Sequence, residues 1–393
     1  MTIINKYLGE CPHCFELSIT TRMLSTNSWC SPNKVTGVAE SSLMVCHKCK
    51  SFIWMEDIII LKRVDSNDTG HSWWLSVSES DAKKVLKNGQ INSKKLTSPQ
   101  KQNLEQFLLF KKNFRKRVIL EDRAKGCLLG MDYADIDGGT SHMALLVYQS
   151  LVENDNIGGD KVDYGDIGRR YLEWYNNNAV DTGIVNAMVF DLVNEGVTFE
   201  EASKEIDKRL NGMTASSRPA CRSLPISVYL AGIISKNPDK LTTSIFKKFI
   251  EQEVKLTHRH NHASRIAIAV NLICICLMLD YSLNESVKNG ADFTSQKTRR
   301  SLGLTPKPIP ITKKDLKNTG YADDALIAAI WFIRNTDSFD EAIKKSMKLK
   351  GKSNYCSVLV GAIGGALYGY FDIKNTIGKS GAFKYYNIES LTL

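Results

Sequence analysis

The sequence predicts a mainly α-helical bundle preceded by a small β-rich zinc module, and three observations lead to this fold class. Gly361, Gly365 and Gly369 recur at four-residue steps in an apolar stretch. Glycine costs about 1 kcal/mol relative to alanine inside a helix, so we expect a neighbouring backbone to pack closely against this stripe. Ser338 and Glu341 have the spacing of a capping box that opens another helix. Near the N-terminus, two Cys-x-x-Cys pairs have the spacing of zinc ligands.

The composition is that of a soluble globular protein. The chain has 393 residues, of which 43% are hydrophobic and 24% charged, a balance typical of folded domains. The longest apolar runs, 266–279 and 358–370, are shorter than the roughly 20 residues that cross a bilayer. We therefore expect core helices and no membrane partner. No charged and apolar leader precedes Cys11, which predicts a cytoplasmic protein with reduced thiols.

The first predicted domain, residues 1–62, is a zinc ribbon. Its ligands are Cys11 and Cys14 in one pair and Cys46 and Cys49 in the other, because two such pairs close a tetrahedral structural site. Four unligated thiols are the alternative interpretation. Strand-like segments rich in β-branched and aromatic residues surround the pairs, at 15–21, 35–45 and 51–61. Other residues that could substitute as ligands are Cys30, His13 and His47.

Positive charge is concentrated in the first third of the chain. The net charge is +10, and residues 1–120 contain 18 Lys and Arg against 10 Asp and Glu. Residues 63–118 read as a polar connector followed by a basic helix, whose cations are Lys111, Lys112, Arg115, Lys116 and Arg117. We expect this part to bind nucleic acid or an acidic protein partner, and a merely solvated surface is the alternative. Salt-dependent binding of nucleic acid distinguishes the two.

The third predicted domain, residues 119–393, carries a series of motifs in a fixed order. Four of them are DRAKGCLLGMDYADIDGG at 122–139, RYLEWY at 170–175, LTHRHNHA at 256–263 and TGYADDALIAAIW at 319–331. This series resembles the ADP-ribosylglycohydrolase family, whose typical motifs are DRALGALLGLAVGDALG, RYLEWY, LTHPHPEA and TGYVVDTLEAALW. The resemblance spans about 122–369 and implies an all-helical bundle.

The same resemblance exposes departures at the site where the family holds two magnesium ions with aspartates. At the matching positions this chain has Gly139 and Thr140 in one motif and Lys352 and Asn354 in another. A lysine ammonium offers no lone pair to a hard dication, so magnesium is not expected. The family's Asn-Gly near the ligand is replaced by Ser-Arg at 217–218.

Two functions follow from this comparison. The first is a degenerate relative that binds an ADP-ribose-like ligand, nucleic acid or protein. The ligand-binding candidates are Asp135, Thr140, Ser141, Arg222, Lys352, Asn354 and Tyr355. The alternative is an active but divergent glycosidic hydrolase, with Asp135 as the candidate catalytic residue. Its rebuilt acidic site consists of Asp132, Asp135, Asp137 and Asp324.

Three further expectations concern local structure. Thr198 and Glu201 form a second capping-box pattern. The polar, proline-containing stretch 284–314 is expected to be a surface connection. His258, His260 and His262 alternate along the chain, and on a helix this spacing does not place all three on one face, so a shared metal is not expected.

Overall fold

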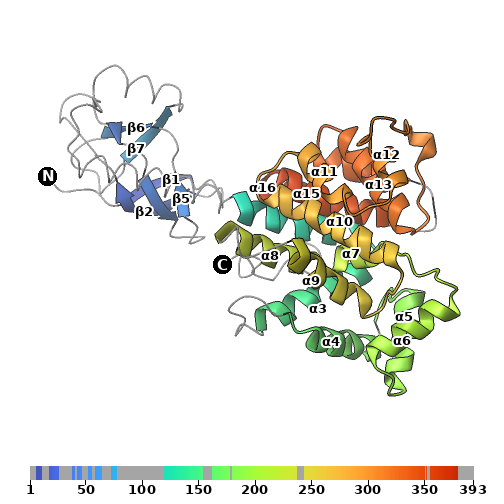
Figure 1. The fold of residues 1–393 in the computed structure, drawn as a ribbon. Helices are drawn as coiled ribbons and strands as arrows, with labels where there is room; N and C mark the ends of the chain where they lie inside the picture. The colour runs from blue at the N-terminus through green and yellow to red at the C-terminus, as the bar shows by residue number, and fades with distance from the viewer. Residues whose placement is uncertain are drawn as a thin grey trace. The chain divides into compact units, whose positions relative to one another are not determined.

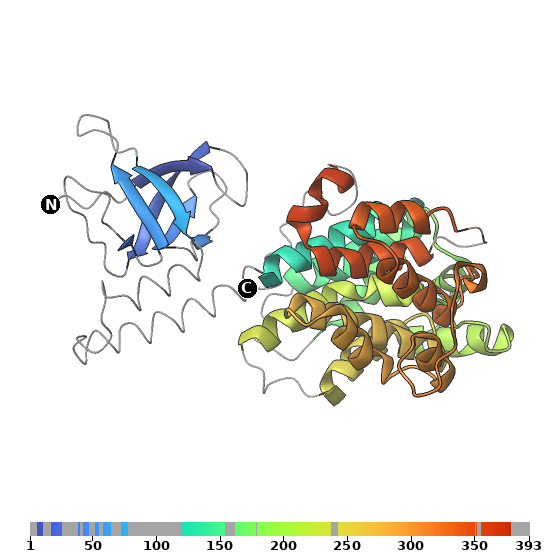
Figure 2. The same ribbon diagram turned by 90° about the horizontal axis from the view of Figure 1, so that it is seen from above.

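The computed structural model describes the backbone of strands between residues 6 and 77. In the C-terminal part it describes residues 119–153, 162–177, 179–236, 243–349, 351 and 355–378. The chain divides into two compact units, residues 1–115 and 116–393. Figures 1 and 2 show the strands in blue and the helices in green to red.

The N-terminal unit contains two antiparallel sheets. Its strands are β1 (Lys6–Glu10), β2 (Leu17–Ser25), β3 (Val38–Ala39), β4 (Ser42–Cys46), β5 (Phe52–Trp54), β6 (Ile58–Arg63) and β7 (Ser72–Val77). One sheet has the order β1-β2-β4-β5 and the other β3-β6-β7. Because β7 pairs with β6 from Ser72 to Val77, the β-rich part extends past residue 62.

Two predictions for this unit fall outside what the structure describes. The side chains of the predicted zinc ligands Cys11, Cys14, Cys46 and Cys49 are not among the described ones, although the backbone of Cys46 ends β4. The predicted basic helix before residue 119 also lies outside the described residues. Both stay predictions.

The C-terminal unit is helical, as predicted. It begins with a helix over residues 119–134. It continues with α3 (Gly139–Glu153), α4 (Tyr164–Asn176), α5 (Ile184–Asn194), α6 (Phe199–Arg209), α7 (Arg218–Arg222), α8 (Leu224–Lys236), α9 (Thr243–Lys255), α10 (Asn261–Met278), α11 (Leu283–Ala291), α12 (Gln296–Ser301), the 3₁₀ turn η3 (Lys313–Asp315), α13 (Ala322–Arg334), α14 (Phe339–Ser346), α15 (Tyr355–Tyr368) and α16 (Tyr370–Ile377). The described residues of this unit contain no strand, only one isolated bridge between Ser216 and Tyr321.

The predicted glycine contact lies between α15 and the helix over 119–134. A Cβ added at Gly365 would lie 2.6 Å from the carbonyl carbon of Gly126, and one at Gly361 would lie 2.8 Å from that of Gly130. Both helices therefore need glycine where their backbones touch, and the predicted close packing is confirmed. Gly369 differs from the prediction because it lies between α15 and α16 with φ +81°.

Asp122 anchors the turn that follows α15. Its Oδ1 accepts a hydrogen bond of 3.0 Å from the backbone N–H of Phe371, and its other oxygen lies where a Cβ at Gly369 would have to be. Burial raises the pKa of Asp122 to about 6, although the backbone hydrogen bond from Phe371 acts in the opposite direction.

The centre of the helical unit is α10, which packs against α7, α8, α9, α11, α13 and α15 (Figure 1). It begins at Asn261, before the apolar run 266–279 in the sequence. By length and composition alone its 18 residues, of mean hydropathy 1.5, could cross a membrane. However, 78% of this stretch is buried inside the unit, as in the core helix of a globular domain.

Helix caps account for several of the boundaries. Thr198 and Ser338 each accept a hydrogen bond from the backbone three residues later, so both predicted helix starts are confirmed.

The expectation of a surface connection over 284–314 is wrong in its first half, where α11 and α12 lie. Ser282 and Ser295 cap these helices in the same way. Both helices are short and mostly polar, so their few apolar residues do not show a clear helical period in the sequence.

Candidate functional site

The short helix α7 carries two arginines one turn apart, Arg218 and Arg222. Pro219 lies in its first turn, where the missing N–H removes no helical hydrogen bond. The side chains are 4% and 0% exposed. A buried guanidinium must be paired and hydrogen-bonded to be tolerated, and these two arginines have different partners.

Arg218 joins the loop before α5 to the start of α15. Its Nη2 forms an ion pair of 2.8 Å with Oδ2 of Asp181, and its Nη1 donates to the Asp181 carbonyl oxygen at 2.6 Å. Its Nε donates to the hydroxyl of Tyr355 at 2.9 Å. Burial raises the pKa of Tyr355, so this phenol keeps its proton at neutral pH.

The loop before α5 holds Asp181 in place through its backbone. Asp181 has φ +46° and Gly183 has φ +79°, a left-handed region that favours glycine and tolerates aspartate. Gly139, at the start of α3, lies directly against this loop, because an added Cβ would be 2.9 Å from the carbonyl carbon of Asp181. The start of α3 therefore packs directly against the backbone of the loop before α5.

Asp135 follows the helix over 119–134 and faces the same region. Its Oδ2 accepts hydrogen bonds from the N–H of Ser141 at 2.7 Å and from the Ser141 hydroxyl at 3.0 Å. Burial raises the pKa of Asp135, while the bonds from Ser141 and the charge of Arg218 act in the opposite direction and Asp181 adds to the rise. We call Asp135, Ser141, Asp181, Arg218 and Tyr355 the Asp135 cluster.

Two buried hydroxyls next in sequence to the cluster have no hydrogen-bond partner among the residues that the structure describes. They are Oγ1 of Thr140 and Oγ of Ser217, on side chains that are 0% exposed. An unsatisfied buried hydroxyl costs roughly 1–3 kcal/mol, so native structures rarely keep two of them without a reason.

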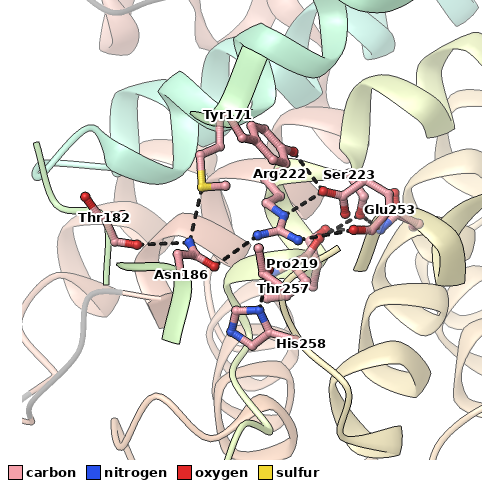
Figure 3. Close-up of polar contacts among 12 residues, drawn as sticks. Tyr171, Thr182, Asn186, Pro219, Arg222, Ser223, Glu253, Thr257 and His258 are labelled. Atoms are coloured by element: carbon pink, nitrogen blue, oxygen red, sulfur yellow. Dashed lines mark hydrogen bonds and ion pairs between the residues drawn. The ribbon is translucent and has the colours of Figure 1, made fainter. Parts of the chain in front are cut away.

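The second arginine of α7 belongs to a buried network (Figure 3). Nε of Arg222 forms an ion pair of 2.6 Å with Oε1 of Glu253, and the hydroxyl of Tyr171 donates to the same oxygen at 2.7 Å. Nη1 donates to Oδ1 of Asn186 at 3.3 Å. Burial raises the pKa of Glu253, and the adjacent Arg222 acts in the opposite direction. This network connects α4, α5, α7 and α9 through Arg222, one turn along α7 from Arg218.

The structure brings several predicted site residues together. Asp135 and Ser141 are hydrogen-bonded and Tyr355 contacts the same cluster, with Thr140 directly beside Ser141. Arg222, also predicted to bind the ligand, is instead paired with Glu253 and hydrogen-bonded to Asn186. Lys352 and Asn354 lie outside the described residues.

Two members of the Asp135 cluster, Arg218 and Asp181, were not predicted as site residues. Their signals in the sequence are the Asp-Thr-Gly turn at 181–183 and the Ser-Arg that replaces the family's Asn-Gly. Neither signal says that the two side chains meet, because they lie 37 positions apart.

The other predicted carboxylates are Asp132, Asp137 and Asp324. Asp132 is buried and Asp137 is exposed, and Asp324 accepts a hydrogen bond of 2.9 Å from the hydroxyl of Thr319. In the part of the chain that the structure describes, no three His, Cys, Asp or Glu side chains are arranged to hold one metal ion. Among the described residues, the guanidinium of Arg218 lies beside the carboxylates of Asp181 and Asp135.

The three alternating histidines also have different partners. His258 Nδ1 lies 2.8 Å from the hydroxyl of Thr257, and burial lowers the pKa of His258 well below its usual value. His260 caps α10 by accepting from the N–H of His262. His262 Nδ1 lies 3.1 Å from Oδ2 of Asp323.

The C-terminal unit is thus an all-helical bundle with a close glycine contact between two of its helices. Its polar cluster lies at the starts of α3, α7 and α15, which are distant in the sequence. The model of the ADP-ribosylglycohydrolase family matches residues 138–379. The chain belongs to this family.

Individual proteins show the same similarity. The chain is 25% identical over 292 residues to an ADP-ribosylarginine hydrolase Tri1 of Serratia proteamaculans (strain 568), covering 64% of this chain and 73% of that protein. It is 23% identical over 294 residues to the protein of that name from Pseudomonas putida (strain GB-1), covering 63% and 71%. A solved chain described as an ADP-ribosylglycohydrolase-related protein complex aligns with a TM-score of 0.49 at 17% identity, covering 70% of this chain and 96% of that one.

Proposed function

We propose that this protein binds an ADP-ribose-like ligand at the Asp135 cluster and does not perform a two-magnesium hydrolysis. The observation that carries the proposal is the guanidinium of Arg218, paired with Asp181 at 2.8 Å beside Asp135. It supplies a fixed positive charge where the family resemblance implies metal ions. A fixed cation neutralises carboxylates, but it has no open coordination position to activate water.

Two observations support a ligand at this cluster. The unpartnered hydroxyls of Thr140 and Ser217 offer hydrogen bonds to a polar molecule. Membership of the family makes an ADP-ribose-like compound the first candidate, and the relatives are named for ADP-ribosylarginine.

The competing function is that of an active, divergent hydrolase. The names of the relatives, which are those of hydrolases, favour this function. The raised pKa of Asp135 also favours it, because a carboxylic acid with a raised pKa suits general acid or base chemistry. Binding and turnover must therefore be measured on the same preparation.

The test replaces Thr140 with valine, which keeps the shape of the side chain and removes only the hydroxyl. We expect wild type to bind ADP-ribose in calorimetry equally well with and without magnesium. Thr140→Val should weaken binding about tenfold, because a lost hydrogen bond of roughly 1.4 kcal/mol corresponds to that factor. The melting temperature should stay the same or rise, since an unsatisfied buried group is removed.

The matched control is Thr305→Val, because Oγ1 of Thr305 is also buried without a partner and lies far from the cluster in sequence. It should leave ADP-ribose binding unchanged. Absence of binding by wild type, or equal effects of both substitutions, refutes the proposal. Magnesium-dependent release of ADP-ribose from ADP-ribosylarginine, lost in Asp135→Asn, establishes the hydrolase instead.

For the N-terminal unit, we propose a structural zinc ion held by Cys11, Cys14, Cys46 and Cys49, because two Cys-x-x-Cys pairs close a tetrahedral site. We expect elemental analysis to find about one zinc per chain in wild type. Cys46→Ser should lose it, whereas Cys30→Ser should keep it. Wild type without zinc, or full zinc in Cys46→Ser, rules out this ligand set.

A further inference from the structure

A polar cavity lies in the helical unit between α9, the start of α10 and the segment that joins α11 to α12. Its volume is about 420 Å³, which is within the range of small-molecule sites. The residues of the Asp135 cluster do not line it. The cavity is therefore a separate feature of the fold.

One wall of the cavity is a charged face of α9. Lys247, Glu251 and Lys255 follow at four-residue steps and line it together. The Nζ atoms of both lysines lie 3.6 Å from the carboxylate of Glu251, which is beyond ordinary hydrogen-bond length. One carboxylate is thus shared by two loosely held ammonium groups, and both lysines keep donors for another partner.

The opposite wall is the first turn of α10. Arg265 is exposed and takes part in none of the hydrogen bonds or ion pairs found among the described residues. Ser264 also lines the cavity and is 4% exposed, and within the described part of the chain its Oγ has no hydrogen-bond partner. The amino end of an 18-residue helix adds positive potential at the same place.

We infer that this cavity binds the phosphate groups of a small nucleotide-like molecule. Three cations, Lys247, Lys255 and Arg265, line it against two carboxylates, Glu251 and Asp292, which leaves a net positive charge for an anion. The Ser264 hydroxyl supplies a buried donor.

Phe293, which is partly buried and lines the cavity from the segment between α11 and α12, offers an apolar face for the rest of the molecule. Asp292 is placed to accept hydrogen bonds from ligand hydroxyl or amino groups. A cavity of 420 Å³ matches a nucleotide, whereas a nucleic-acid backbone is typically followed by an extended basic groove.

The experiment titrates the full-length protein with ADP and with inorganic pyrophosphate in a calorimeter. We expect both to bind, and Lys247→Gln or Arg265→Gln to weaken each about tenfold, as the loss of one charge-assisted hydrogen bond does. Ser264→Ala should weaken binding without lowering the melting temperature, because it removes an unsatisfied hydroxyl. The matched control is Lys248→Gln, an exposed neighbour on α9 that does not line the cavity, and it should bind like wild type.

Several outcomes overturn the inference. One is the absence of heat with either compound at millimolar concentration. Another is binding that survives in the Lys247→Gln, Arg265→Gln double variant but is lost in Thr140→Val, which assigns the ligand to the Asp135 cluster. A single-stranded oligonucleotide that binds through Arg265 when pyrophosphate does not indicates a nucleic-acid surface instead.

Discussion

Gly365→Ala is expected to destabilise the helical unit by at least about 3 kcal/mol, the upper end of the usual cost of overpacking. The new methyl group would lie 2.6 Å from the carbonyl carbon of Gly126, and backbone on both sides leaves no flexible side chain to yield. The two helices must move apart and lose contacts along their whole length. Urea denaturation followed by the helical signal in circular dichroism measures the effect.

The matched control is Gly364→Ala, one position away in the same helix. Its methyl group would meet Cδ2 of Phe339 at 3.2 Å, and an aromatic side chain can shift by a few tenths of an ångström. Both substitutions gain the same helix propensity, roughly 1 kcal/mol, so their difference isolates the backbone contact. Equal stabilities of the two variants would show that the close approach of α15 to residues 119–134 is not what holds the bundle.

Arg222→Met is expected to cost about 3–5 kcal/mol, the usual effect of breaking one side of a buried ion pair. Glu253 would remain at 0% exposure without its partner cation, and Oδ1 of Asn186 would lose the hydrogen bond from Arg222. Thermal and urea unfolding of the full-length protein measure the loss.

Two further variants make this prediction specific. The double variant Arg222→Met, Glu253→Gln removes both charges and should recover part of the lost stability, because it leaves no unpaired ion. Arg209→Met removes an exposed arginine paired with Glu205 and should change stability by less than about 1 kcal/mol. A small effect at Arg222 comparable to that at Arg209 would contradict the structural role of the network.

Much of the helical unit could be predicted from local patterns. Short-range patterns predicted the helix starts at Thr198 and Ser338, because a cap depends only on residues within one turn. The four-residue step between Gly361 and Gly365 is also a local pattern, and it predicted the close packing of α15. The motif order placed the chain in its family. The region 284–314 was misjudged because α11 and α12 are short and mostly polar, so their apolar positions are too few to show a clear period.

The candidate site was only half predictable. Asp135, Ser141 and Tyr355 were candidates from the sequence and lie in the cluster, whereas Arg222, another candidate, is paired with Glu253. The sequence does not say which of two arginines one turn apart faces which acid, because a helix of five residues fixes neither its rotation nor its depth.

The sequence by itself determined the helical class and the close contact demanded by its glycines. Only the tertiary structure decided that Arg218 meets Asp181 and Tyr355, and that Ser264 and Arg265 face the lysines of α9. The physical reason is the range of the interactions. Caps and helical periods act over a few residues, whereas these contacts join segments that are brought together only when the whole bundle packs around α10.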